Sequence, residues 1–75
     1  MTVEELLKSN HCARVMSVMF IWDSTPVSSY QRFSEKEPFL RCGIDQKQKM
    51  SPNLLNAEIF SFSLERNGRV LSIEL

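Results

Sequence analysis

His11 and Cys12 are the pair of neighbouring residues in this sequence that could perform nucleophilic catalysis. A cysteine nucleophile needs a histidine base whose side chain faces it, and a third group that orients the base. Adjacent residues of an extended chain point to opposite faces, so this pair has the wrong geometry. We therefore expect a boundary histidine and a half-buried cysteine rather than a catalytic pair.

Metal binding and phosphate cradling are also disfavoured. His11, Cys12 and Cys42 fall one ligand short of a structural zinc site, and the sequence has no CxxC or HxxxH spacing. With two glycines, the chain has no glycine-rich phosphate loop. We expect no metal, no cofactor and no enzymatic activity.

Arginine is the residue type with which this chain could bind an anion. The two at the C-terminal end flank an Asn67-Gly68 turn and would lie opposite one another, where like charges destabilise a hairpin. Such a positive tip either contacts a phosphate or carboxylate or keeps a loop soluble, and the second role is the more common. The candidate anion-binding residues are Arg32, Arg41, Arg66 and Arg69.

Aromatic residues gather around a turn at residues 23–26. If Trp22, Tyr30 and Phe33 are exposed together, they form a site for a partner protein, because Trp and Tyr bury a large area at little cost in entropy. Alternatively, Trp22 and Phe33 complete the core, which is the more common outcome in a short chain.

Length and charge exclude several classes of function. The chain has 75 residues, which predicts a single domain over residues 1–75 with a core close to the smallest that folds unaided.

Nine basic and nine acidic residues cancel, so we expect neither nucleic acid nor a membrane surface as a partner. Near-neutrality favours self-association weakly. The absence of a leader-like segment and of disulfide spacing predicts a cytoplasmic protein with free thiols.

Asn67-Gly68 is a strong hairpin signal, because a two-residue type I′ turn needs positive φ at both central positions. With Arg66 opposite Arg69, Glu65 faces Val70 and the rest of the register follows. Side chains alternate between faces of a strand, so one face of the hairpin is apolar. This dry face, which we expect the N-terminal helix to cover, consists of Phe60, Phe62, Leu64, Leu71, Ile73 and Leu75.

The remaining elements follow from capping and apolar patterns. Thr2 and Glu5 form a capping box that predicts a helix of about two turns. Residues 12–22 predict a strand with two largely apolar faces, residues 27–33 a weaker strand near an edge, and residues 39–44 a short strand. Residues 45–50 read as a polar linker, and Ser51 and Pro52 begin a helical turn. The predicted fold is α+β: a short N-terminal helix packed on a mostly antiparallel sheet of about four strands, ending in the hairpin.

Three stretches of the sequence resemble a group of short proteins encoded by phages and mobile elements of Gram-positive bacteria. The stretches are residues 2–7 (TVEELL), 54–59 (LLNAEI) and 67–75 (NGRVLSIEL), together 21 of the 75 residues. The motifs are structural. Some small phage proteins of comparable size inhibit host defence, so the resemblance implies an accessory protein that works by binding.

We therefore expect a non-enzymatic interaction module that binds, and inhibits, a host defence protein through Trp22, Tyr30, Phe33 and the middle segment. The alternative hypothesis is a small homo-oligomer that binds an anionic small ligand, such as a nucleotide, through its arginines.

Overall fold

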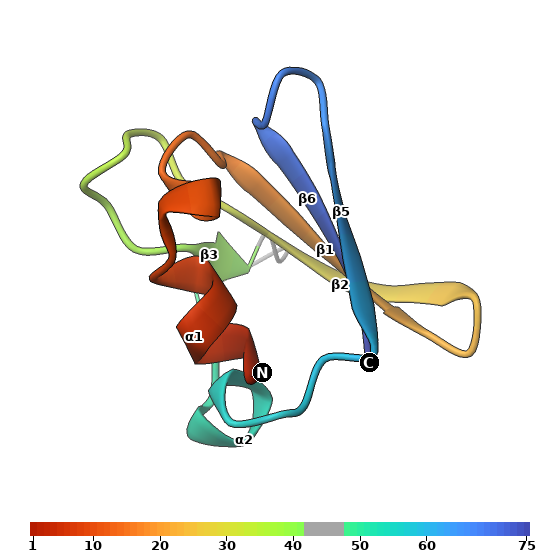
Figure 1. The fold of residues 1–75 in the computed structure, drawn as a ribbon. Helices are drawn as coiled ribbons and strands as arrows, with labels where there is room; N and C mark the ends of the chain where they lie inside the picture. Colours follow the sequence, from red (N-terminus) through yellow and green to blue (C-terminus); the bar gives the residue numbers. More distant parts are fainter. Residues whose placement is uncertain (42–47) are drawn as a thin grey trace.

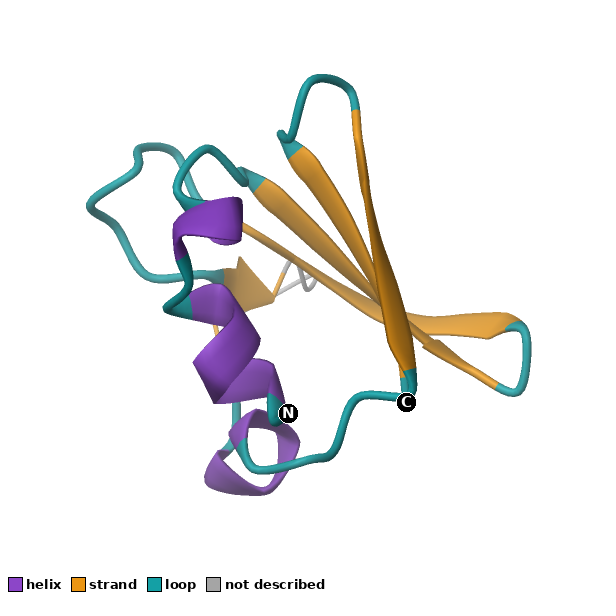
Figure 2. Cartoon of the chain, viewed as in Figure 1, coloured by secondary structure: helices purple, strands orange, loops and turns teal. Residues whose placement is uncertain are grey.

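The computed structural model describes residues 1–41 and 48–75. Its elements are joined by short connections, and the helical segments lie together on one side of the strands (Figures 1 and 2). In chain order they are α1 (Val3–Leu7), the 3₁₀ helix η1 (Asn10–Cys12), β1 (Ser17–Trp22), β2 (Thr25–Gln31), β3 (Leu40–Arg41), β4 (Gln48–Lys49), α2 (Pro52–Leu55), β5 (Ser61–Glu65) and β6 (Val70–Glu74).

Both α-helices begin where side chains satisfy the free amides of the first turn. The Glu5 amide donates to Thr2 Oγ1 at 3.2 Å, and the Thr2 amide donates to Glu5 Oε1 at 3.1 Å, which confirms the predicted capping box. The hydrogen bonds that the Thr2 amide and the Thr2 hydroxyl donate to the Glu5 carboxylate lower its pKa. Ser51 caps α2 in the same way, with Pro52 in its first turn. With five and four residues, neither helix would persist alone.

The six strands form one mixed sheet in the order β4-β3-β2-β1-β6-β5. The prediction of a mostly antiparallel sheet of about four strands under a short helix is therefore wrong: the sheet has six strands and is mixed, with four antiparallel pairings and one parallel pairing. The parallel pairing joins β1 to β6, and residues 23–69, more than half of the chain, lie between them. β2 is an inner strand rather than an edge strand, and β4 lies where a linker was predicted. Of the predicted strand 39–44, residues 42–44 lie outside the described residues.

The register predicted for the C-terminal hairpin is confirmed pair by pair. Ser61 lies opposite Glu74, Phe62 opposite Ile73, and the ladder ends at Glu65 and Val70. The turn is wider than a two-residue one, because Arg66 (φ 53°) as well as Asn67 (φ 60°) and Gly68 (φ 81°) is left-handed. The Arg69 amide still donates to the Arg66 carbonyl, at 3.3 Å.

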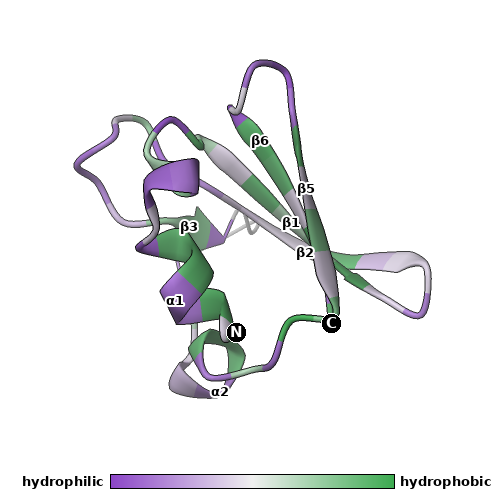
Figure 3. Cartoon of the chain, in the orientation of Figure 1, coloured by the Kyte–Doolittle hydropathy of each residue, from purple (hydrophilic) through white to green (hydrophobic). Residues whose placement is uncertain are grey.

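The core lies between α1 and the centre of the sheet. Apolar segments of α1, β1 and β6 are visible in Figure 3. Ten residues are buried, and no buried side-chain polar atom of the described residues lacks a hydrogen-bond partner. The buried residues are Val3, Leu6, Cys12, Val15, Val18, Phe20, Tyr30, Met50, Leu71 and Ile73.

Candidate functional site

The structure does not bring the three predicted partner-binding aromatics onto one surface. Tyr30 is buried, and its ring meets that of Phe20 edge to face with the centroids 5.6 Å apart. Trp22 is 61% exposed at the C-terminal end of β1. Phe33 is also exposed, but it follows the C-terminal end of β2, at the opposite end of the antiparallel β1–β2 ladder. Tyr30 is thus a core residue, and Trp22 and Phe33 cannot form one contact.

The dry face of the hairpin is only half covered. In β6, Leu71 and Ile73 are fully buried. Their cross-strand neighbours in β5 are not: Leu64 is 37% exposed and Phe62 is 41% exposed, and Phe60, just before β5, is 80% exposed. The expectation that the N-terminal helix covers this whole face is therefore wrong for β5.

The length of α1 accounts for the uncovered half. A five-residue helix is about 7.5 Å long and about 10 Å wide. Six strands at about 4.8 Å spacing extend over roughly 24 Å. A helix of this size can shield the inner strands but not the edge strand β5 as well.

Trp22 extends the apolar row of β5. A shallow hollow at this end of the sheet is lined by Trp22, Phe60 and Leu75 together with the acidic residues Asp23 and Glu74. Ser61 donates to Glu74 Oε2 at 3.0 Å, and the alternation of the ladder places both of these side chains on the face opposite the apolar row. We call Trp22, Phe60, Phe62 and Leu64 the edge surface; it is apolar, and Asp23 follows it at the Trp22 end.

The two edges of the sheet differ in how they are protected. β4 is two residues long and carries Lys49, and short charged edge strands resist pairing with other chains. β5 has five residues, all exposed, with neither proline nor lysine among them. Sequence reasoning recognised the apolar residues of β5 but assigned them to the core. The signal that it missed was the ratio of helix length to sheet width.

Arg32 has a structural role. Its guanidinium donates to the backbone carbonyls of Cys12 and Ala13 at 3.1 and 3.2 Å, and also to those of Val15 and Glu35. Its guanidinium carbon lies 4.5 Å from the centre of the Phe39 ring. These bonds occupy the donors that an anionic ligand would need, so Arg32 leaves the predicted anion-binding set.

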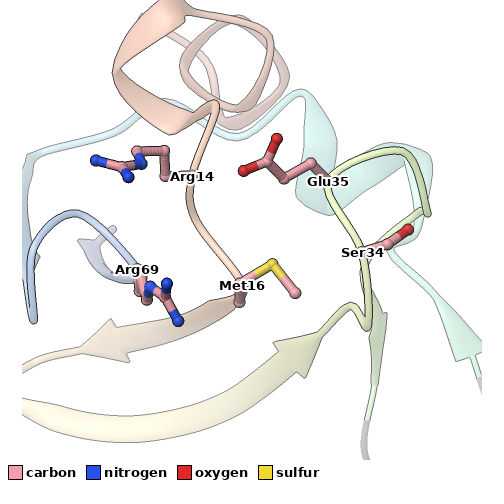
Figure 4. Close-up of a pocket in the computed structure, with 5 residues that line it drawn as sticks. All are labelled: Arg14, Met16, Ser34, Glu35 and Arg69. Atoms are coloured by element: carbon pink, nitrogen blue, oxygen red, sulfur yellow. The ribbon is translucent and has the colours of Figure 1, made fainter.

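The other three predicted arginines separate into two places. Arg41 lies on β3 opposite Tyr30, and β2 and β1 lie between it and β6. Arg66 and Arg69 lie in the hairpin turn, where they share a shallow hollow with Asn67 and with Arg14, which the sequence analysis did not single out. A second hollow of about 240 Å³ joins Arg14 and Arg69 to Met16, Ser34 and Glu35 (Figure 4).

His11 and Cys12 occupy different environments: His11 is exposed, and Cys12 is buried rather than half-buried as predicted. Burial raises the pKa of the Cys12 thiol, an effect that a hydrogen bond with Ser9 and the charge of Arg32 oppose. Cys42 lies outside the described residues. Within residues 1–41 and 48–75, no three His, Cys, Asp or Glu side chains gather as metal ligands would.

In the described part of the chain, no helix has the length and apolar character needed to cross a bilayer. Comparison of the chain with protein-family models, with curated proteins and with solved structures gives no match.

Proposed function

We propose that this protein is a non-enzymatic interaction module that binds a partner protein along the open edge of its sheet. The observation that carries the proposal is the edge surface: an unprotected five-residue edge strand whose apolar row is left in water. An extended segment of a partner can add to such an edge through main-chain hydrogen bonds, while side-chain contacts select the partner.

The exposed side chains are of the types that dominate binding energy. Trp and Phe bury large areas, and each Phe or Leu that passes from water to an interface contributes about 1.5–3 kcal/mol before the costs of association. Trp22 and Phe60 are the most exposed members of the edge surface, at 61% and 80%. Of the edge surface, these two side chains would therefore bury the most additional area against a partner.

The rim of the hollow indicates the partner's chemistry. Asp23 lines the hollow beside Trp22 and Phe60. The complementary partner is an extended segment with apolar side chains at alternate positions and a lysine or arginine at the end that lies over Trp22. That basic residue would meet both the Asp23 carboxylate and the face of the indole ring.

The resemblance to phage and mobile-element proteins indicates what kind of protein the partner is and where the two would meet. On that basis the partner is a host protein, a defence protein in particular, that the module binds and inhibits in the cytoplasm. Trp22 is the member of the predicted aromatic set that this proposal retains.

The test compares two lysine substitutions on one strand. Phe62→Lys places a charge on the apolar row, whereas Ser63→Lys places the same charge on the opposite face of β5. Each variant and the wild type are used to capture proteins from a bacterial lysate, and the captured protein is purified. We expect the wild type and Ser63→Lys to bind it, Phe62→Lys to lose binding, and the amides of β5 to become protected from hydrogen exchange in the complex.

Phe60→Ser is the second variant, because an 80% exposed side chain contributes little to folding. It should weaken binding while the melting temperature stays near that of the wild type. The proposal is wrong if folded Phe62→Lys and Phe60→Ser bind the purified partner as tightly as the wild type. Light scattering of the isolated protein separates binding of a partner from pairing of two copies, which would contradict the host-protein assignment.

A further inference from the structure

We propose that Arg14, Arg66 and Arg69, with Asn67, form a binding site for the phosphate group of a small molecule. The site lies at the turn of the C-terminal hairpin. It is independent of the edge surface, because the hairpin turn and the Trp22 hollow lie at opposite ends of β6. The set differs from the arginines predicted from the sequence: Arg14 enters, and Arg32 and Arg41 leave.

The backbone of Arg69 brings the turn to the segment that carries Arg14. The Arg69 carbonyl accepts hydrogen bonds from the amides of Met16, at 2.8 Å, and Ser17, at 3.1 Å. These two bonds begin the parallel pairing of β1 with β6, which starts at Ser17 and Val70. The sheet therefore determines the approach of Arg69 to Arg14, which are far apart in the sequence.

Arg32 fixes the backbone of the segment that carries Arg14. Its guanidinium donates to the carbonyls of Cys12, Ala13 and Val15, the residues on either side of Arg14. The Arg14 backbone is thereby fixed on the body of the protein. Arg32 thus positions the segment from which Arg14 extends into the hollow.

The turn presents Arg66 at a cost in backbone energy. A left-handed conformation is unfavourable for a residue that is neither glycine nor asparagine, because its Cβ crowds the backbone. Arg66 adopts it with φ 53°, next to Asn67 and Gly68, which tolerate it better. The residues that follow the strand thus turn back toward Arg14 and leave Arg66 and Arg69 on one hollow.

The charges around this hollow are unbalanced. The ion pairs found among the described residues are Met1 with Glu58 and Lys8 with Glu4, and neither involves these three arginines. No carboxylate lines the hollow of Arg14, Arg66, Asn67 and Arg69; Glu35 lines the neighbouring one. The like charges of three arginines around one hollow repel one another, and a bound anion would relieve that repulsion.

The donor geometry favours phosphate over a carboxylate. Each guanidinium presents a planar fork that matches two oxygens of a phosphate, and bidentate bonds of this kind are among the strongest that proteins make. Three arginines and the Asn67 side-chain amide can donate hydrogen bonds to three phosphate oxygens at once, whereas a carboxylate has only two oxygens. The ligand class is therefore a phosphate dianion or phosphate monoester.

The experiment is a titration of ¹⁵N-labelled protein followed by NMR at low salt. The probes are inorganic phosphate, ATP, and adenosine as the phosphate-free control, with sodium chloride at matched ionic strength. We expect saturable shifts confined to residues 14–17 and 66–69 with phosphate and ATP. ATP binding more tightly than phosphate would identify a nucleotide, and equal affinities would identify free phosphate. Adenosine or chloride producing the same shifts would overturn the proposal, as would the absence of saturation.

Charge-removing variants locate the site. Arg66→Gln in the exposed turn and the double variant Arg14→Gln/Arg69→Gln should each weaken phosphate binding by about tenfold or more, the effect of losing a charge-assisted hydrogen bond. Arg41→Gln removes the same charge from β3 and should bind within about twofold of the wild type. Equal weakening by Arg41→Gln would show a general effect of charge and would contradict the site.

Discussion

The rings of Tyr30 and Phe20 pack edge to face, with the centroids 5.6 Å apart and the ring planes at 88°. The pair lies on adjacent strands in the centre of the sheet, and both residues are buried. Edge-to-face pairs contribute about 0.5–1.5 kcal/mol beyond the burial of their area. Tyr30 therefore stabilises the folded state and is not part of a binding surface.

The first prediction concerns this pair. Tyr30→Ala should lower the free energy of unfolding by about 3 kcal/mol or more, as large-to-small aromatic substitutions in cores do. Tyr30→Phe keeps the ring and should cost far less. Urea denaturation measures both. A Tyr30→Ala protein as stable as the wild type, but unable to bind its partner, would restore Tyr30 to the contact surface.

The uncovered half of the hairpin gives a matched pair of leucines. Leu71 and Leu64 lie opposite each other, one fully buried and the other 37% exposed. Leu71→Ala should lower the unfolding free energy by about 3 kcal/mol, and Leu64→Ala by about 1 kcal/mol. Chemical denaturation under one buffer condition compares them. Equal losses would mean that β5 is covered in solution, and the edge surface would then not exist in the free protein.

Arg32 provides a prediction about positioning. Arg32→Lys keeps the charge but loses the planar fork that reaches the carbonyls of Cys12, Ala13 and Val15. We expect it to lower the unfolding free energy by about 2 kcal/mol, because carbonyls near the core lose their donors. Arg41→Lys, on exposed β3, is the control and should change stability by less than about 0.5 kcal/mol. Similar values for the two variants would contradict the role assigned to Arg32.

The capping box predicts how α1 responds to acid. The hydrogen bonds from Thr2 lower the pKa of Glu5, so the ionised carboxylate stabilises the folded state. This contribution is complete above the ordinary glutamate pKa of about 4.3 and is lost as the pH falls through the lower pKa of the folded state. The stability difference between the wild type and Glu5→Gln should therefore shrink below about pH 4. The same comparison in a Thr2→Ala background should show a somewhat smaller pH dependence, because the hydroxyl bond to the carboxylate is lost while the larger contribution, from the backbone amide of residue 2, remains.

Local signals in the sequence predicted those elements whose partners are close along the chain. The Asn67-Gly68 turn set the register of β5 with β6, and Thr2 and Ser51 marked the starts of the helices. The parallel pairing of β1 with β6 had no such signal, because its partners come from the two ends of the sequence and no turn joins them. Neighbours across that pairing, such as Arg14 and Arg69, were unpredictable for the same reason.

The exposure of the edge surface could not be predicted from the sequence for a different reason. Alternation along β5 shows that Phe62 and Leu64 share a face with Ile73 and Leu71. It does not show how far a helix extends over that face, which depends on the width of the complete sheet. The strand β4 has two residues and too little pattern to be recognised from the sequence, whereas β3, also of two residues, falls within the strand predicted over residues 39–44.

The parallel pairing of β1 with β6 also sets the order of events during biosynthesis. Ser17–Trp22 emerges early from the ribosome, but the neighbour that completes its second side, Val70–Glu74, is translated more than fifty residues later. Contacts so distant in sequence require a long loop to close, which slows folding. The apolar strand β1 must therefore remain without that partner until β6 has been made, and apolar surface exposed in such an interval is prone to aggregation.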